Sequence, residues 1–185
     1  MSERSETTGS SRHQGREVAL QVLYAVDLAG HSSPRRLVET GASIDLVDNV
    51  EAEVVADVEV VGEVEQRLKR PAEDSDRIFD RVAEHFVVPK GALEFARELV
   101  TGVVARLPDL DALISLHARN WRVSRMAVVD RNVLRLGAHE LRDTQTPVAV
   151  VIDEAVDLAR RFGSDRSPSF VNGVLDAIAK EVRSV

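Results

Sequence analysis

The amino-acid sequence predicts an all-α fold, a compact bundle of about seven or eight helices. Apolar residues recur at steps of three and four along most of the chain, which is the spacing of an amphipathic helix. Three segments open with Ser or Thr followed by Pro, an arrangement typical of a helix N-terminus. No pair of alternating apolar runs is joined by a short Asn-Gly or Asp-Gly turn, so hairpins are not predicted.

The N-terminal part of the chain is expected to contain a tail and one clear helix. Residues 1–11 are polar and rich in Ser and Thr, so a disordered tail is predicted before a single domain over residues 12–185. A helical pattern starts at Arg16 and ends at Gly30, a residue type common just past helix C-termini. Ser33-Pro34 then predicts a new helix start.

Residues 39–70 form an atypical acidic segment. Between Glu39 and Glu65 there are nine acidic residues and no Lys or Arg, whereas the other 158 residues carry 24 basic and 22 acidic side chains. This segment therefore accounts for the formal net charge of −7. Its valines recur at helical spacing, although valine also favours strands. We expect a helix here.

Six further helices are expected in the rest of the chain. They are predicted at 75–86, 90–108, 109–121, 124–144, 147–163 and 167–182. In the last helix, Ser167 is the expected N-cap, and Asn172 and Gly173 are poor helix formers in its interior. We interpret Gly173 as a site where a neighbouring helix approaches closely, with Asn172 bonding across the contact.

The composition argues against several function classes. The chain has no Cys, no Gly-rich phosphate loop, and neither the HExxH nor the GxSxG motif. Its five His residues are scattered, with no pair at i, i+3 or i, i+4. No apolar run approaches the ~20 residues of a membrane span, and the polar N-terminus does not resemble a signal peptide. We therefore expect a cytoplasmic, non-enzymatic protein without a cofactor or metal and without membrane association.

Arginine is concentrated in one stretch of the second half. The cluster consists of Arg119, Arg122, Arg125, Arg131, Arg135 and Arg142. Only Asp130 and Glu140 oppose these arginines within the stretch.

Three segments, in this order and spacing, resemble the NusB family of bacterial transcription antitermination factors. They are "GREVALQVLYAVDL", "VDRNVLRLGAHEL" and "VVIDEAVDLARRFGSDRSPSFVNGVLDAIA". The resemblance implies a helical fold of two small packed subdomains and no catalysis. It also implies binding of single-stranded boxA RNA of ribosomal RNA transcripts, jointly with the ribosomal protein NusE. The expected setting is the transcription elongation complex.

The resemblance also points to site residues. The stretch before the first helix would bind phosphates through Arg12, His13 and Arg16, fewer cations than the family's usual run of arginines. Tyr24 would lie near the RNA and partner surface.

Near the C-terminus, Ser167 would present a helix N-terminus to phosphate, and Phe170 would stack on a base. Asp130 and Arg131 would face NusE. These residues also have purely structural interpretations that involve no ligand, namely a solubilising tail, core packing of Tyr24 and Phe170, and a surface ion pair of Asp130.

Alternative functions stay open at this point. The chain is also compatible with a helical protein–protein adapter that binds little RNA by itself. Another alternative is the helical accessory domain of an RNA-modifying methyltransferase; we expect no room for its catalytic domain after Val185. A homodimer is a further possibility. For RNA binding, Arg12→Glu with Arg16→Glu is expected to abolish binding without loss of helicity.

Overall fold

The computed structural model describes residues 3–31, 75–119 and 121–183. The helix predicted in the acidic segment 39–70 and the start predicted at Ser33-Pro34 lie outside these residues. The described part is all-α, which confirms the predicted fold class. Its elements are α1 (Glu3–His31), a helix over residues 75–83, α3 (Lys90–Ala105), α4 (Leu107–His117), the short 3₁₀ helix η2 (Val123–Arg125), α5 (Val128–Asp143), α6 (Val148–Phe162) and α7 (Ser167–Val182).

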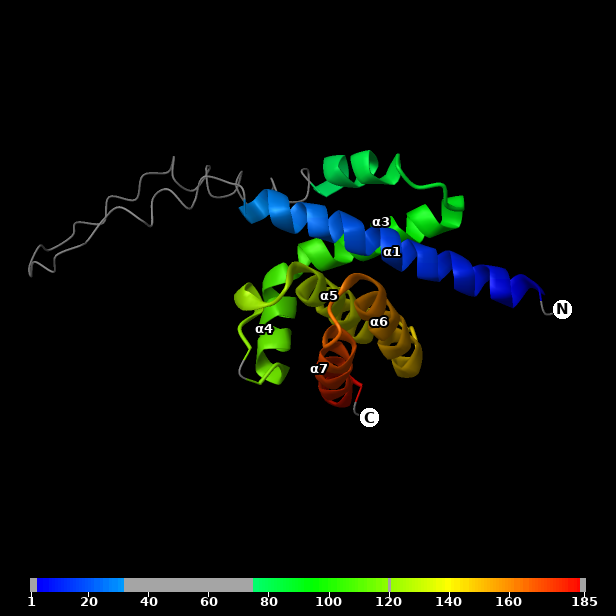
Figure 1. Ribbon diagram of the computed structural model, residues 1–185. Helices are drawn as coiled ribbons and strands as arrows, with labels where there is room; N and C mark the ends of the chain where they lie inside the picture. The colour runs from blue at the N-terminus through cyan, green and yellow to red at the C-terminus, as the bar shows by residue number, and fades with distance from the viewer. Residues whose placement is uncertain (1–2, 32–74, 120, 184–185) are drawn as a thin grey trace, which may run out of the picture.

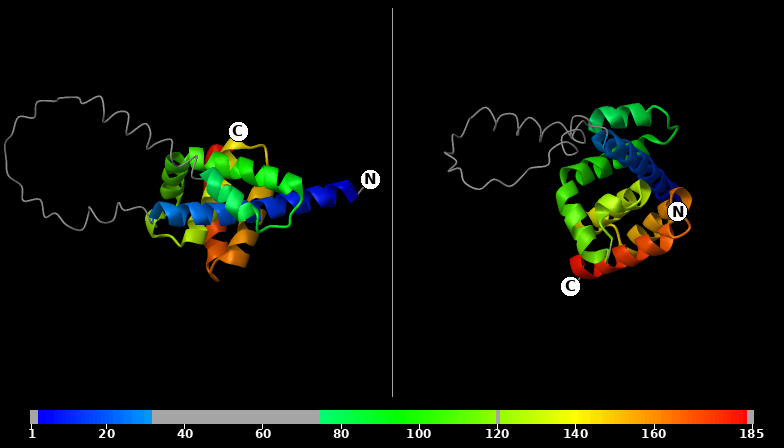
Figure 2. Two further views of the ribbon diagram at one scale, coloured as in Figure 1. Left: turned by 90° about the horizontal axis from the view of Figure 1, so that it is seen from above. Right: turned by 60° about the vertical axis from the view of Figure 1, so that its left-hand side comes forward.

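Helix α1 is longer than predicted at its N-terminal end. It begins at Glu3, within the tail that was expected to be disordered, and its first turns project beyond the rest of the molecule (Figures 1 and 2). Adding a residue to an existing helix gains one backbone hydrogen bond without a new nucleation cost. The well-packed part of α1 therefore extends into a polar segment that has no apolar face of its own.

The helices form two packed groups, as predicted (Figure 1). One contains α1, α3 and the helix at 75–83, which buries Phe79 and whose Asp76 and Asp80 bind Arg97 of α3. The other contains α4, α5, α6 and α7. Both groups contribute to one hydrophobic core of Val, Leu, Ile and Ala side chains.

Helix α5 joins the two groups because it contacts all five of the other labelled α-helices. Every residue from Arg131 to Leu141 is consequently buried. The segment includes five polar or charged side chains, namely Arg131, Asn132, Arg135, His139 and Glu140. Burying such groups is costly unless they have hydrogen-bond or ion-pair partners, so the surroundings of α5 must supply them.

The interpretation of Gly173 as a close-contact site is wrong. Gly173 is exposed on α7, and a Cβ atom added there would meet no atom within 4 Å. Asn172 is exposed as well. The close approach occurs at Gly15 instead, where an added Cβ would lie 2.8 Å from the carbonyl oxygen of Ala92. Glycine at position 15 thus allows α1 to pack directly on the backbone of α3.

Neither a membrane span nor a metal site is found in the described part of the chain. None of its helices combines the length and the apolar character needed to cross a bilayer. The same residues contain no group of three or more metal-ligating side chains.

Candidate nucleic-acid interface

Arg16 occupies a buried position between α1 and α5. Its side chain is 3% exposed, and its Nε and Nη2 donate to the two carboxylate oxygens of Glu140 at 2.8 and 2.7 Å. The guanidinium also lies 5.3 Å from the centre of the Phe95 ring. This two-bond geometry is the strongest that Arg forms with a carboxylate. Arg16 is therefore placed as a structural ion-pair partner, and its position does not support the predicted phosphate contact.

Arg12 lies one turn before Arg16 and is exposed. Its guanidinium carbon is 5.4 Å from the centre of the Phe95 ring, within the range of a cation–π contact. Pro89 and Gly91 line a hollow together with Arg12. Of the two predicted phosphate-binding arginines, Arg12 is thus the one that solvent and a ligand can reach.

His13 is held between two carboxylates. Its Nε2 is 3.1 Å from Glu17 Oε1, and its Nδ1 is 2.9 Å from Glu154 Oε2 on α6. Its side chain is about one-third exposed. His13 therefore lies at the surface next to Arg12, as the sequence predicted, but its ring nitrogens are engaged by carboxylates.

Tyr24 and Leu28 are exposed side chains one turn apart on α1. Tyr24 is 40% exposed, so more than its hydroxyl group is open to solvent. An exposed phenol ring can stack on a base or pack against a protein and still keep its hydroxyl in water. The Tyr24 side chain is thus accessible to the RNA or the partner protein that was predicted to lie near it.

The predicted partner residue Arg131 is committed to an internal network. Its side chain is 6% exposed, and its Nε lies 2.5 Å from Asp27 Oδ2 on α1. The same oxygen of Asp27 accepts hydrogen bonds from Asn132 and Arg135. Arg135 in addition binds both carboxylate oxygens of Asp111 on α4 at 2.7 and 2.8 Å. The network connects α1, α4 and α5, so Arg131 is placed to stabilise the fold.

The charges of this network also act on Arg135. Burial alone would lower the pKa of Arg135, but the hydrogen bond and charge of Asp111, with those of Asp27, raise it above its ordinary value. Arg135 is thus a permanent cation enclosed by two carboxylates.

Asp130 lies in the first turn of α5, where the helix dipole favours a carboxylate. The surface ion pair with Arg131 is not formed, because Arg131 binds Asp27 instead. The Oδ1 atom of Asp130 is buried, and no residue of the described ranges forms a hydrogen bond with it. Unpaired buried acceptors are rare and costly in proteins. Asp130 therefore retains a hydrogen-bond acceptor without a partner among the described residues, at the N-terminal end of α5.

Ser167 closes the loop between α6 and α7 and is 1% exposed. Its Oγ accepts the backbone N–H of Ser164 at 2.9 Å and lies 3.0 Å from Ser164 Oγ. The predicted N-cap is wrong by one residue, because the N-cap position belongs to Arg166 and Ser167 makes no side-chain cap bond. Gly163 ends α6, as predicted. Ser167 is too buried to face an RNA phosphate directly.

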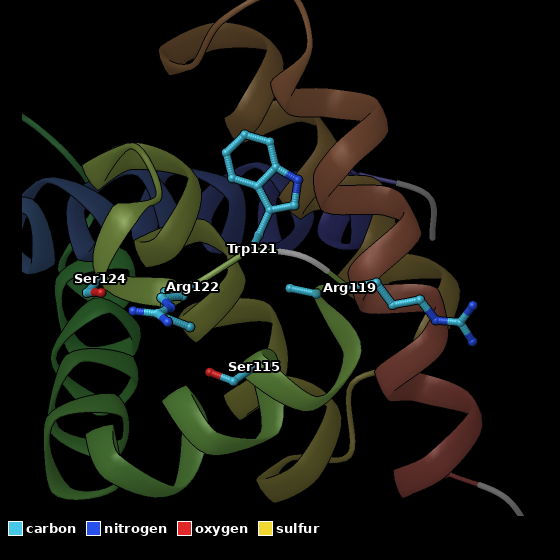
Figure 3. Close-up of a pocket in the computed structure, with 7 residues that line it drawn as sticks. Ser115, Arg119, Trp121, Arg122 and Ser124 are labelled. Carbon is cyan, nitrogen blue, oxygen red and sulfur yellow. The ribbon is translucent and has the colours of Figure 1, made fainter.

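Phe170 is half-buried on α7, and its ring lies against Trp121. The two ring centroids are 5.7 Å apart and the ring planes are inclined by 53°. Trp121 is 56% exposed in the segment between α4 and η2 (Figure 3). Trp121 was not among the site residues predicted from the sequence. The available signal was the only tryptophan of the chain within the run "RNWRVSR".

A sequence model of the NusB family matches residues 49–180. The transcription antitermination protein NusB of Sorangium cellulosum is 39% identical over 178 residues, which cover 95% of this chain and 96% of the relative. That of Nitratiruptor sp. is 34% identical, with the same coverage of both chains.

Solved structures give the same result for the fold. Thermotoga maritima NusB superposes with a TM-score of 0.65 at 28% identity, covering 92% of this chain and 91% of that one. A complex of the antitermination factors NusB and NusE with double-stranded RNA gives a TM-score of 0.64 at 27% identity. That match covers 93% of this chain and 98% of the solved one.

Proposed function

The chain belongs to the NusB family of transcription antitermination factors, and we propose that it binds boxA-type single-stranded RNA together with the ribosomal protein NusE. In this proposal the RNA is part of a ribosomal RNA transcript, and the assembly acts on the transcription elongation complex in the cytoplasm. The chain contributes binding surfaces and no catalytic group.

One observation carries the proposal. The fold matches, over 93% of this chain, that of a NusB chain solved in complex with NusE and double-stranded RNA, which supports binding of both kinds of ligand by this chain. The accessible side chains agree with two ligands. Arg12 is an exposed cation, Tyr24 an exposed aromatic residue, and Asp130 a partly exposed acidic residue in the first turn of α5. Cations and aromatic rings suit a single RNA strand, and a partly exposed carboxylate suits a donor of a protein partner.

The proposal assigns roles by accessibility. Arg12 and His13 serve the phosphates, while Tyr24 and Phe170 lie near the RNA. Asp130 faces NusE. Arg16, Arg131 and Ser167, which were predicted as contacts, support these residues from inside the fold and do not touch the ligands.

The test is a fluorescence-anisotropy titration of labelled boxA-like RNA and of a scrambled RNA, with and without NusE, at two salt concentrations. We expect selective binding that tightens with NusE. Arg12→Gln should weaken binding to both RNAs and reduce the salt slope by about one. Arg160→Gln is the matched control, because Arg160 is an exposed arginine on α6 that pairs with Asp157. Equal affinity for both RNAs under every condition contradicts the boxA proposal.

A second candidate, the protein–protein adapter, is favoured by the burial of Arg16. With Arg16 paired to Glu140, the N-terminal stretch has one accessible arginine, Arg12, within the described residues from 11 to 23. The same titration separates the two functions. An adapter would bind NusE without a measurable gain in RNA affinity.

A further inference from the structure

Trp121 has a larger exposed fraction than is usual for a large aromatic side chain. It is the only Trp of the chain, and 56% of it is open to solvent. It helps to line an open hollow of about 510 Å³ at the end of α4, together with Ser115, Ala118, Arg119, Arg122, Val123 and Ser124. Burying such an indole on a ligand would remove a large apolar area from water.

Phe170 contacts Trp121 but leaves 56% of it exposed. The inclination of 53° between the two rings excludes parallel stacking of Phe170 on an indole face. Phe170 itself is half-buried against the core. It is therefore suited to support Trp121, and the exposed part of the indole is the stacking surface.

Three arginines lie close to Trp121 in the sequence, namely Arg119, Arg122 and Arg125. All three are exposed, and none forms an ion pair or side-chain hydrogen bond with another residue in the part of the chain that the structure describes. Figure 3 shows the guanidinium groups of Arg119 and Arg122 on opposite sides of the segment that carries Trp121.

We propose that Trp121, supported by Phe170, is a stacking site for one unpaired base of single-stranded RNA, with Arg119 and Arg122 binding the flanking phosphates. The inference deepens the proposed RNA-binding function and rests on it. An aromatic ring between cations accepts a base of any identity on its face, while the cations bind the phosphates of the RNA backbone. A base inside a duplex already has both faces stacked, so the site takes an unpaired base.

The single tryptophan makes the site directly observable. Its fluorescence is followed while single-stranded boxA-like RNA, the same sequence as a duplex, or inorganic polyphosphate is added, with NusE present throughout. The Trp121→Phe protein, measured in parallel, gives the signal of any tryptophan in NusE. We expect quenching of Trp121 by the single strand and none by polyphosphate or the duplex.

Variants give an independent readout. Trp121→Ala should weaken single-strand binding in the anisotropy assay by about tenfold or more, and Trp121→Phe should restore part of the loss. Val87→Ala is the control for removing an exposed apolar side chain elsewhere. Circular dichroism checks that each variant retains its helices.

The outcomes distinguish the inference from the proposed function. In one outcome the RNA binds in the anisotropy assay, but the fluorescence of Trp121 does not change and Trp121→Ala binds RNA as tightly as the unchanged protein. This outcome overturns the stacking site and keeps the RNA-binding function. Quenching by polyphosphate to the same extent as by RNA also overturns it, as does quenching by NusE alone that RNA does not alter. Absence of binding to any RNA overturns both.

Discussion

Two arginine-rich regions that are neighbours in the sequence differ in physical state. Arg119, Arg122 and Arg125 precede α5 and are exposed, with no ion pair in the described residues. Arg131 and Arg135, on α5, are at most 9% exposed and are bound to Asp27 and Asp111. The location of the backbone makes the difference, because α5 is enclosed by other helices and the preceding segment is not. Arginines that cluster in the sequence therefore do not have to form one basic surface, because some of them can be buried in ion pairs.

The buried set should be the sensitive one, and Arg16→Glu is expected to have the largest effect. The variant would place a second carboxylate next to Glu140, which is 2% exposed, and would leave both without a cation. Breaking a buried ion pair by removing one partner costs about 3–5 kcal/mol, and like charge adds to the cost. Urea denaturation followed by circular dichroism measures the change.

This expectation reverses the earlier one, in which Arg12→Glu with Arg16→Glu would leave the helicity intact. Arg12→Glu alone is the control, because Arg12 is exposed. Equal stability of Arg16→Glu and the unchanged protein would contradict the buried ion pair.

Arg135→Met tests the second buried network. The change leaves Asp27 and Asp111 with one cation fewer, and we expect a loss of about 3 kcal/mol in the free energy of unfolding. Arg125→Met, in the exposed region, should stay within about 0.5 kcal/mol of the unchanged protein. The difference between the unfolding free energies of the two variants measures the contrast between the buried and the exposed region. Similar free energies for the two variants would contradict this contrast.

His139 adds a pH dependence to the buried region. Burial lowers the pKa of His139 from 6.5, against the opposing charge of Asp143. The unfolded chain therefore takes up a proton more readily than the native state. Stability should decrease as pH falls through about 6.5 and continue to decrease down to the lowered native pKa.

The measurement is the melting temperature between about pH 7.5 and about pH 5.5, with His139→Gln as the comparison. We expect a smaller pH dependence in the variant. An identical slope in both proteins would show that other groups cause it.

Gly173→Ala is expected to have the smallest effect, and it is stabilising. The position is helical and exposed, and an added Cβ meets nothing within 4 Å. The change should add about 1 kcal/mol and raise the melting temperature by about 2–4 °C. Gly15→Ala should do the opposite, because its Cβ would press on the carbonyl oxygen of Ala92. Calorimetry of the two variants checks the signs.

The helical fold was readable from the sequence because periodicity, proline and glycine act locally. The helix that Gly163 ends and the helix containing Ser167-Pro168 lie within one or two residues of their predicted bounds. Helix α1 begins at Glu3 and not at Arg16, a start that the sequence did not predict because the continuation depends on the docked part of the same helix.

The site was less predictable, because the roles of its residues depend on partners far away in the sequence. Arg16, Leu20, Leu23 and Asp27 recur at steps of four, three and four, so the sequence places both charged residues on the apolar face of α1. That pattern is a signal of buried ion pairs. The identity of their partners on α5 is determined only by tertiary packing.

The pairing of Arg16 with Glu140 also constrains how the chain is made. The two residues are 124 positions apart. At a synthesis rate of about 5–20 residues per second, Glu140 is added roughly 6 to 25 s after Arg16. Until then the Arg16 guanidinium lacks the carboxylate that pairs with it in the folded protein, so this side chain stays hydrated even where α1 already packs on α3.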